Sequence, residues 1–311
     1  YKKRQKNIWS KLKKLLILGG SGFIGSSIVD YAIDKKLLNN KINKIYILSR
    51  NKKSKKINNK YIKINYLRNN ILDVKKLPTA DYIIYCLKNE NIKISNDYFS
   101  QFKKLIKQFK FKPKILFTSS GAVYGKNINK KKNLESEKIS INSVKNLIGY
   151  KKKYAMEKIF LEKKFKELSL ENYKISIARC FTFIGKNIIK YNYAISDLIN
   201  DANNDRRITL NSNINVFRSY MNSDDLCKWL IKILIKSNKK CPIYNVGSDK
   251  VINLKELTKK IGAIKNKKIS IKLKESKKFD YYVPSINKAR KKLNLKISIS
   301  LNDSLNSIIK L

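Results

Sequence analysis

The sequence contains no histidine, and this absence excludes several common kinds of active site. Ser-His-Asp and Cys-His mechanisms need an imidazole as the base, and His-ligated metal centres need it as a ligand. Acid–base chemistry must therefore come from Tyr, Lys, Ser, Asp, Glu or Cys side chains. We expect no metal site.

Cysteine and long apolar runs are also scarce. The four cysteines, Cys86, Cys180, Cys227 and Cys241, include no Cys-x-x-Cys pair. Cys86 and Cys180 lie in short apolar runs, so we interpret them as buried free thiols, which suit a reducing cytoplasm. No stretch approaches the roughly 18 apolar residues of a membrane span, and the basic residues 1–14 lack the apolar core of a signal peptide. We expect a cytoplasmic protein without a membrane span.

Acidic residues are few, since 22 Asp and Glu stand against 71 Lys and Arg and give a net charge of +49. Such a charge is typical of nucleic-acid binding. The lysines, however, run through the whole chain, only eight of the cations are Arg, and no segment interleaves aromatic residues with a basic groove. We therefore attribute the charge to a lysine-rich composition and do not expect nucleic acid as a partner. The charge would help to attract a polyanionic small substrate.

Hydrophobic residues make up 42% of the 311 residues, enough for a sizeable core. Short apolar runs alternate with longer amphipathic runs, which is typical of βαβ units on a parallel sheet. We therefore predict an α/β fold with a Rossmann-type doubly wound parallel sheet. Strands are expected at residues 15–18, 44–48, 61–66, 82–87, 115–118 and 174–179, and helices at 23–35, 96–108 and 150–168.

The rhythm breaks after Arg179. Helices are expected at residues 194–202, 224–235, 253–261 and 301–309, strands at 208–210, 217–221 and 243–246, and a loop over the polar run 126–143. We predict a basic N-terminal extension over residues 1–13 and a dinucleotide-binding Rossmann domain over residues 14–180. A smaller mixed substrate-binding lobe is expected over residues 181–311, and some of its strands could return to the main sheet.

Four of the ten glycines fall within the motif GGSGFIG at residues 19–25. The motif directly follows the first predicted strand and opens the first predicted helix. Glycines there permit a tight turn, let the backbone approach a pyrophosphate and let the helix pack closely on the sheet, while the helix N-terminus attracts phosphates. A plain glycine-rich turn is the alternative. The residues predicted to bind a dinucleotide are Gly19, Gly22, Phe23, Ile24 and Gly25.

The end of the second predicted strand bears on the choice between NAD and NADP. An acid there would bind the ribose 2′-hydroxyl of NAD, whereas a cation would accept the 2′-phosphate of NADP. The strand ends in Ser49-Arg50, and no acid lies between Lys41 and Lys60. Arg50 therefore favours NADP as the cofactor, unless it is a solvated surface residue. Nearby lysines at 52, 53, 55 and 56 could supply the same charge.

Hydroxyl side chains follow the fifth predicted strand, where parallel sheets bind ligands. Further along, Tyr154 and Lys158 are four residues apart and so share one face of a helix. A phenol has a pKa of about 10, and a neighbouring ammonium lowers it, so such a pair can move a proton on and off an alcohol. Tyr-x-x-x-Lys also occurs at Tyr31 and Lys35, so its position, not its presence, favours Tyr154.

These motifs together resemble an extended short-chain dehydrogenase/reductase, and more narrowly the NAD-dependent epimerase/dehydratase family that modifies nucleotide sugars. The resemblance rests on GGSGFIG at 19–25, SSGAVYG at 119–125 and YAMEK at 154–158 with Glu162, and covers about residues 14 to 311. In the second half it is carried by Ala178-Arg179-Cys180-Phe181 with Gly185, Arg218-Ser219-Tyr220 with Asp224-Asp225, Asn245-Val246-Gly247-Ser248, and Tyr282-Val283-Pro284 with Lys288-Ala289.

The resemblance implies roles for individual residues. Tyr154 would be the acid–base, and Lys158 its partner and a ligand of the nicotinamide ribose. Ser120 would hydrogen-bond the sugar hydroxyl, with Ser119 as a rival, and Arg218 would hold the substrate diphosphate. The partner implied is a nucleotide-sugar substrate. The oligomeric state stays open, although relatives often form a homodimer through a four-helix interface.

Two departures from the family pattern bear on function. Dehydratases carry an Asp-Glu pair where this chain has Gly121-Ala122, which argues against dehydration. The stretch Tyr85-Cys86-Leu87-Lys88 lacks the small residues usual beside the adenosine, which bears on cofactor fit. We therefore expect a nucleotide-sugar epimerase or oxidoreductase that uses reversible hydride transfer at a sugar carbon, with C4 the expected position. The alternatives are an NADPH-dependent keto-sugar reductase and, more distantly, a non-catalytic dinucleotide- or RNA-binding Rossmann protein.

Overall fold

The computed structural model describes residues 12–34, 37, 41–50, 56–58, 62–89, 91–127, 129–190, 193–204, 206–273 and 278–309. Two compact units interleave along the chain. The first comprises residues 1–119, 153–178 and 230–243, and the second residues 120–152, 179–229 and 244–311. The division near residue 180 that the sequence suggests stays a proposal, and residues 1–11 of the predicted extension lie outside the described residues.

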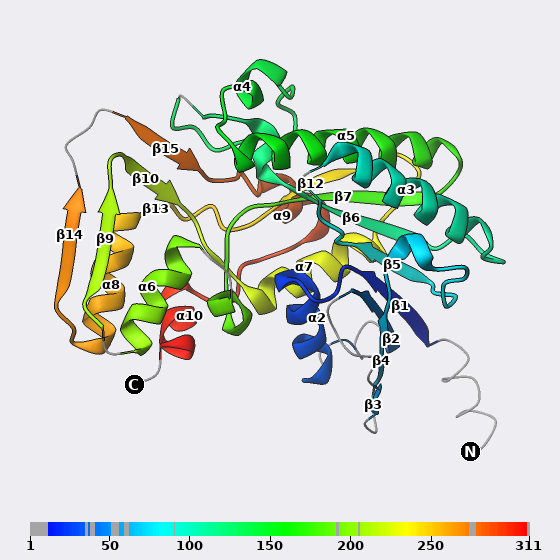
Figure 1. Cartoon of the computed structure of the whole chain (residues 1–311), viewed down its shortest axis with the longest axis horizontal. Coiled ribbons are helices and arrows are strands. Elements are labelled where there is room, and N and C mark those ends of the chain that lie inside the picture. Colours follow the sequence, from blue (N-terminus) through cyan, green and yellow to red (C-terminus); the bar gives the residue numbers. More distant parts are fainter. Residues whose placement is uncertain are drawn as a thin grey trace. The chain divides into compact units, whose positions relative to one another are not determined.

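The main sheet confirms the predicted Rossmann-like α/β fold (Figure 1). Its strand order is β12-β7-β6-β5-β1-β2-β4-β3. Strand β1 is the centre of this order, because Ile17 pairs in parallel with Ile47 of β2 on one side and with Ile84 of β5 on the other. The strand order therefore reverses at β1, and such a reversal opens a crevice at the carboxyl ends of the strands. The strands are β1 (Lys13–Leu18), β2 (Ile42–Ser49), β3 (Lys56–Asn58), β4 (Lys63–Arg68), β5 (Tyr82–Tyr85), β6 (Lys114–Ser120), β7 (Lys174–Cys180) and β12 (Ile243–Val246).

Helices cover both faces of the sheet in the first unit. Figure 1 shows α2 (Phe23–Ile33) on one face, and α3 (Ile92–Lys107) with α5 (Tyr150–Leu170) on the other. Between α3, α5 and the sheet lies a cluster of aromatic rings, in which Phe165 stacks on Phe117 at 4.6 Å and meets Phe99 edge-on at 5.1 Å. These buried rings fix both helices against the sheet.

The second unit contains smaller sheets. Within the described residues these have the orders β13-β10-β15, β11-β8 and β14-β9. Their strands are β8 (Phe183–Ile184), β9 (Ile208–Ser212), β10 (Asn215–Arg218), β11 (Met221–Asn222), β13 (Ile252–Asn253), β14 (Ile269–Leu273) and β15 (Phe279–Tyr282). The remaining helices are α4 (Ile141–Lys145), α6 (Ala194–Asn203), α7 (Ser223–Ile235), α8 (Leu254–Lys265), α9 (Asn287–Leu293) and α10 (Leu301–Ile308), with 3-10 turns η2 (Ile71–Asp73), η3 (Gly121–Tyr124) and η4 (Lys186–Lys190).

Several local predictions differ from the structure. The predicted strand 217–221 is divided between β10 and β11, which belong to different sheets, and α4 begins inside the predicted loop 126–143. Cys86 lies just after β5 and is only half-buried, whereas Cys180 is buried as expected. Within the described residues, no helix combines the length and apolar character that crossing a membrane requires.

The aromatic cluster predicts where the fold is most sensitive to truncation. Phe165→Ala should lower the free energy of unfolding by about 3–5 kcal/mol, because it removes a fully buried ring and leaves a cavity. Phe111→Ala is the matched control, since that ring is 76% exposed and its loss should cost less than about 0.5 kcal/mol. Urea denaturation followed by circular dichroism measures both. Equal losses for the two variants would contradict a core at this position.

Candidate active site

The glycine turn brings the end of β1 into direct contact with the residues that follow β5. Gly19 has φ of +86°, and a Cβ there would stand 2.8 Å from the carbonyl oxygen of Cys86. A Cβ on Gly25 would stand 2.4 Å from the Cα of Gly20, so this glycine lets α2 pack closely on the turn. Helix α2 begins at Phe23 with Gly22 as its N-cap, which places the N–H groups of the predicted residues Phe23 and Ile24 in its first turn.

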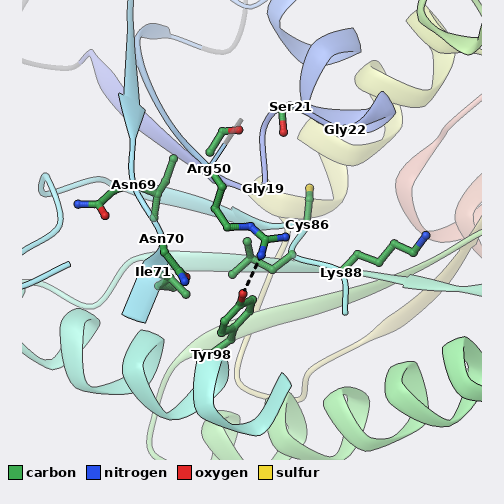
Figure 2. A pocket seen from close by; sticks show the side chains of 13 residues that line it. Gly19, Ser21, Gly22, Arg50, Asn69, Asn70, Ile71, Cys86, Lys88 and Tyr98 are labelled. Atoms are coloured by element: carbon green, nitrogen blue, oxygen red, sulfur yellow. Dashed lines mark hydrogen bonds between the residues drawn. The ribbon is translucent and has the colours of Figure 1, made fainter. Parts of the chain in front are cut away.

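A cavity of about 170 Å³ lies at the carboxyl ends of β1, β2 and β5 in the first unit (Figure 2). Of the predicted dinucleotide ligands, Gly19, Gly22 and Arg50 line it directly. Two cations and no carboxylate lie among the described lining residues, so the cavity suits an anionic ligand. The lining residues are Gly19, Ser21, Gly22, Leu48, Ser49, Arg50, Asn69, Asn70, Ile71, Cys86, Leu87, Lys88 and Tyr98.

Arg50 occupies the middle of this cavity. Its guanidinium donates a 3.3 Å hydrogen bond to the hydroxyl of Tyr98 on α3, shown as a dashed line in Figure 2. The same view shows the Lys88 side chain extending away from Arg50, while Cys86 and Leu87 of the same stretch also line the cavity. The arginine that follows β2 is thus held by a neutral partner and keeps its charge directed at the cavity.

Lys158 lies on α5 and is almost fully buried. Its ammonium donates to the carbonyl oxygen of Leu87, a cavity-lining residue, at 3.3 Å, and lies 3.4 Å from Oε2 of Glu157. The hydroxyl of Ser95 on α3 donates to Oε1 of Glu157 at 3.0 Å. Burial raises the pKa of Glu157, and the Lys158 ammonium and these hydrogen bonds oppose the rise. Lys158 is therefore fixed between a carbonyl of the cavity wall and a buried carboxyl group.

Tyr154 lies one turn before Lys158 on the same helix face. The ammonium of Lys158 lies 5.5 Å from the centroid of the Tyr154 ring, and the ammonium of Lys88 lies at the same distance. The structure thus brings the predicted Tyr–Lys pair together in the first unit. Tyr31, the tyrosine of the second Tyr-x-x-x-Lys match, lies on α2, and Lys35 is outside the described residues.

The two candidate serines have different surroundings. Ser119 is buried and donates a 2.7 Å hydrogen bond to Oε1 of the buried Glu162. Ser120, in the second unit, shares a 3.2 Å hydrogen bond with the hydroxyl of Tyr282. Its Oγ also caps the 3-10 turn η3 by accepting from the N–H of Ala122. The Ser119 hydroxyl therefore donates to a carboxylate, whereas the Ser120 hydroxyl shares a hydrogen bond with a phenol and can either donate or accept it.

Arg218 in the second unit is held by Asp280. Its guanidinium donates to Oδ2 of Asp280 at 2.7 Å and to the carbonyl oxygens of Phe217 and Asp280 at 2.8 and 3.0 Å. Burial raises the pKa of Asp280, but the Arg218 guanidinium and the Lys151 ammonium outweigh it, so the carboxyl pKa is lowered. The pair contributes stability at neutral pH and loses it as pH falls through that lowered pKa.

Tyr282 connects the two predicted residues of the second unit. Its hydroxyl contacts Ser120, and the guanidinium carbon of Arg218 lies 5.7 Å from the centroid of its ring. Sequence reasoning gave no site role to Tyr282, Asp280, Glu157 or Lys88. Glu157 could have been noticed as an acid next to Lys158, but the contacts of the others depend on tertiary structure.

Comparisons with known proteins bear on the family and the fold of this chain. A model of the NAD dependent epimerase/dehydratase family matches residues 15–247. No match was found among curated protein sequences. Among solved structures, a UDP-N-acetylglucosamine 4-epimerase from Methanobrevibacter ruminantium M1, in complex with UDP-N-acetylmuramic acid, is 21% identical, with a TM-score of 0.76 over 96% of this chain and 97% of that chain.

Two further structures show how varied such enzymes are. A dTDP-glucose 4,6-dehydratase from Bacillus anthracis, in complex with NAD, is 15% identical, with a TM-score of 0.73 over 96% of this chain and 95% of that chain. RMD from Pseudomonas aeruginosa, complexed with NADPH, is 17% identical, with a TM-score of 0.70 over 96% and 98%. At these identities the likeness establishes the fold. Because the family model covers most of the sequence, the chain belongs to the NAD dependent epimerase/dehydratase family.

Proposed function

We propose that this chain is a nucleotide-sugar epimerase or oxidoreductase that oxidises and reduces a sugar carbon, with C4 the expected position and Tyr154 as the acid–base. One observation carries the proposal. Lys158 donates to the carbonyl oxygen of Leu87 in the cavity wall and also faces the ring of Tyr154, so the acid–base pair adjoins the cavity within one unit.

The residues of the cavity fit a nicotinamide dinucleotide. Gly22 lines the cavity, and a Cβ there would meet no protein atom closer than 3.7 Å, so the space above the turn is open to a ligand. The first N–H groups of α2 and the Arg50 guanidinium suit its phosphates. When bound, the dinucleotide would supply the hydride acceptor and donor for the sugar carbon.

The chain's own residues would handle the proton and the orientation of the sugar. Tyr154 would take the proton from the sugar hydroxyl and return it, while the Lys158 ammonium favours the phenolate form. Ser120 would hydrogen-bond the reacting hydroxyl, since Ser119 is already committed to Glu162. Arg218 would bind the substrate diphosphate, with Asp280 holding the guanidinium in place.

The region after Ser120 argues against dehydration. Elimination of water needs an acid and a base beside the sugar, and this chain has Gly121 and Ala122 where dehydratases carry Asp and Glu. A Cβ on Gly121 would stand 2.6 Å from the ring of Phe181. The space that a carboxylate side chain would need at residue 121 is therefore filled, which supports epimerisation or reduction instead.

A keto-sugar reductase that uses NADPH is the second candidate, and Arg50 favours it. The guanidinium lies in the cavity beside Ser49, and the described lining contains no carboxylate that would repel a 2′-phosphate. A reductase would consume NADPH, whereas an epimerase would keep NAD bound and return the hydride to the sugar within each turnover. Incubation with a panel of nucleotide sugars and both cofactors, with products read by mass spectrometry and NMR, separates the two.

The acid–base assignment predicts the effect of removing one hydroxyl. Tyr154→Phe should lower kcat on the substrate found in that panel by about 10²- to 10⁴-fold, because the ring remains but the titrating group is lost. Cofactor affinity should stay nearly intact. Tyr150→Phe, one turn earlier and exposed, is the matched control and should remain active.

Normal turnover by Tyr154→Phe would reject the assignment and make Tyr150 the next candidate. Cofactor binding without turnover of any sugar would favour the non-catalytic alternative.

The diphosphate assignment predicts a change in KM. Arg218→Ala should raise KM for the nucleotide sugar about ten- to a hundredfold, because a charge-assisted contact of roughly 1.5–3 kcal/mol is lost. The substitution also leaves Asp280 without its arginine, so the Arg218→Ala/Asp280→Asn double variant controls for the unpaired carboxylate and should show the same KM. An unchanged KM in both variants would move the diphosphate site elsewhere. Arg207 would then be favoured over Arg179, because Arg207 is exposed whereas Arg179 is buried and donates to Tyr124.

The position of Arg50 predicts the cofactor preference. NADP(H) should bind at least about tenfold more tightly than NAD(H), because a planar guanidinium meets the two charges of the 2′-phosphate. Arg50→Ala should weaken NADP(H) binding and leave NAD(H) binding unchanged, so NAD(H) serves as the internal control. Titration of both cofactors by fluorescence at fixed low salt measures this. Tighter binding of NAD(H) by the wild type would refute the preference and favour the epimerase.

A further inference from the structure

Lys88 lies after β5 at the wall of the cavity, and its ammonium is directed toward Tyr154. The Nζ atom lies 5.5 Å from the centroid of the Tyr154 ring, the same separation as for Lys158. In Figure 2 the Lys88 side chain extends away from Arg50. Tyr154 therefore has two ammonium groups near its ring, and they come from two elements of the first unit.

The two lysines differ in environment. Lys158 is buried, and the carboxyl group of Glu157 lies 3.4 Å from its ammonium. In its ionised form Glu157 offsets part of the positive charge that Lys158 presents to Tyr154. Lys88 is exposed and belongs to the loop after β5, whereas Lys158 belongs to α5. A second ammonium at this place adds positive charge to the surroundings of the phenol.

We propose that Lys88 is a positioning residue for proton transfer, in that its ammonium stabilises the phenolate form of Tyr154 together with Lys158. The proposal rests on the proposed function only in naming Tyr154 as the acid–base. A cation near a phenol favours the phenolate by Coulomb attraction, so Tyr154 would act as a base closer to neutral pH. The charged groups near the Tyr154 ring include the ammonium of Lys88 from the loop after β5 and that of Lys158 from α5. The carboxyl group of Glu157 contacts the Lys158 ammonium.

Exposure of Lys88 gives the proposal a second consequence. Charges at the surface are screened by salt, whereas a buried ammonium such as that of Lys158 is screened far less. The contribution of Lys88 to the titration of Tyr154 should therefore shrink at high ionic strength, and that of Lys158 should persist. A merely structural role for Lys88 would give no such dependence on salt.

The titration of Tyr154 can be measured without any substrate. In protein labelled with ¹³C at tyrosine Cζ, the NMR signal that Tyr154→Phe removes belongs to residue 154. At low salt, Lys88→Met should raise the titration midpoint of that signal by about half to one pH unit, and Lys88→Arg should restore most of the difference. In about 1 M salt the wild type and Lys88→Met should differ by much less.

Lys112→Met is the matched control. It removes one positive charge from a lysine whose ammonium lies 4.9 Å from the ring of Tyr173, so the change in net charge is the same. This variant should leave the titration midpoint of the residue 154 signal unchanged. Equal midpoints for the wild type and Lys88→Met at low salt would overturn the role of Lys88. Failure of the proposed function would show separately, as full turnover by Tyr154→Phe.

Discussion

The close contact between the glycine turn and the residues after β5 is the constraint on which the site depends. Gly19 takes a left-handed φ, and its missing Cβ leaves room for the carbonyl group of Cys86. The next residue, Leu87, lines the cavity, and its carbonyl oxygen accepts a hydrogen bond from the Lys158 ammonium. A side chain at residue 19 would push these segments apart, and the cavity would then lose the wall that it shares with the acid–base pair.

Helix α5 buries three ionisable side chains on one stretch, namely Glu157, Lys158 and Glu162. Each has a polar partner, since Glu157 contacts Lys158 and accepts from Ser95, while Glu162 accepts from Ser119. Buried ion pairs are often no more stabilising than apolar side chains of similar size. A helix that served only to cover the sheet would not need them. Their presence is consistent with a requirement to hold an ammonium at a defined point beside the cavity.

The second unit places a different tyrosine beside Ser120. Tyr282 is half-buried, and desolvation of its hydroxyl raises its pKa far above the ordinary value, so the hydroxyl stays neutral near pH 7. It can therefore share a hydrogen bond with Ser120 but does not compete as a base. Tyr154 has two ammonium groups near its ring, whereas Tyr282 has the guanidinium of Arg218, whose effect on its pKa is smaller than that of desolvation. The contrast between these environments gives the two phenols different proposed roles.

The sequence by itself determined the features whose partners are close along the chain. The glycine motif, the strand before it and the helix after it form one continuous segment, and Tyr154 and Lys158 share a face because of helical spacing alone. The α/β class followed from the alternation of apolar and amphipathic runs. The tertiary structure decided everything that joins distant segments. It committed Ser119 to Glu162, paired Arg218 with Asp280 across 62 residues, and brought Lys88 to Tyr154. It also divided residues 217–221 between two sheets, because a short extended segment has no local signal for which strand will be its neighbour. Periodicity records which side of an element is buried, but the partners of a side chain depend on how the strand ends and helices meet in space.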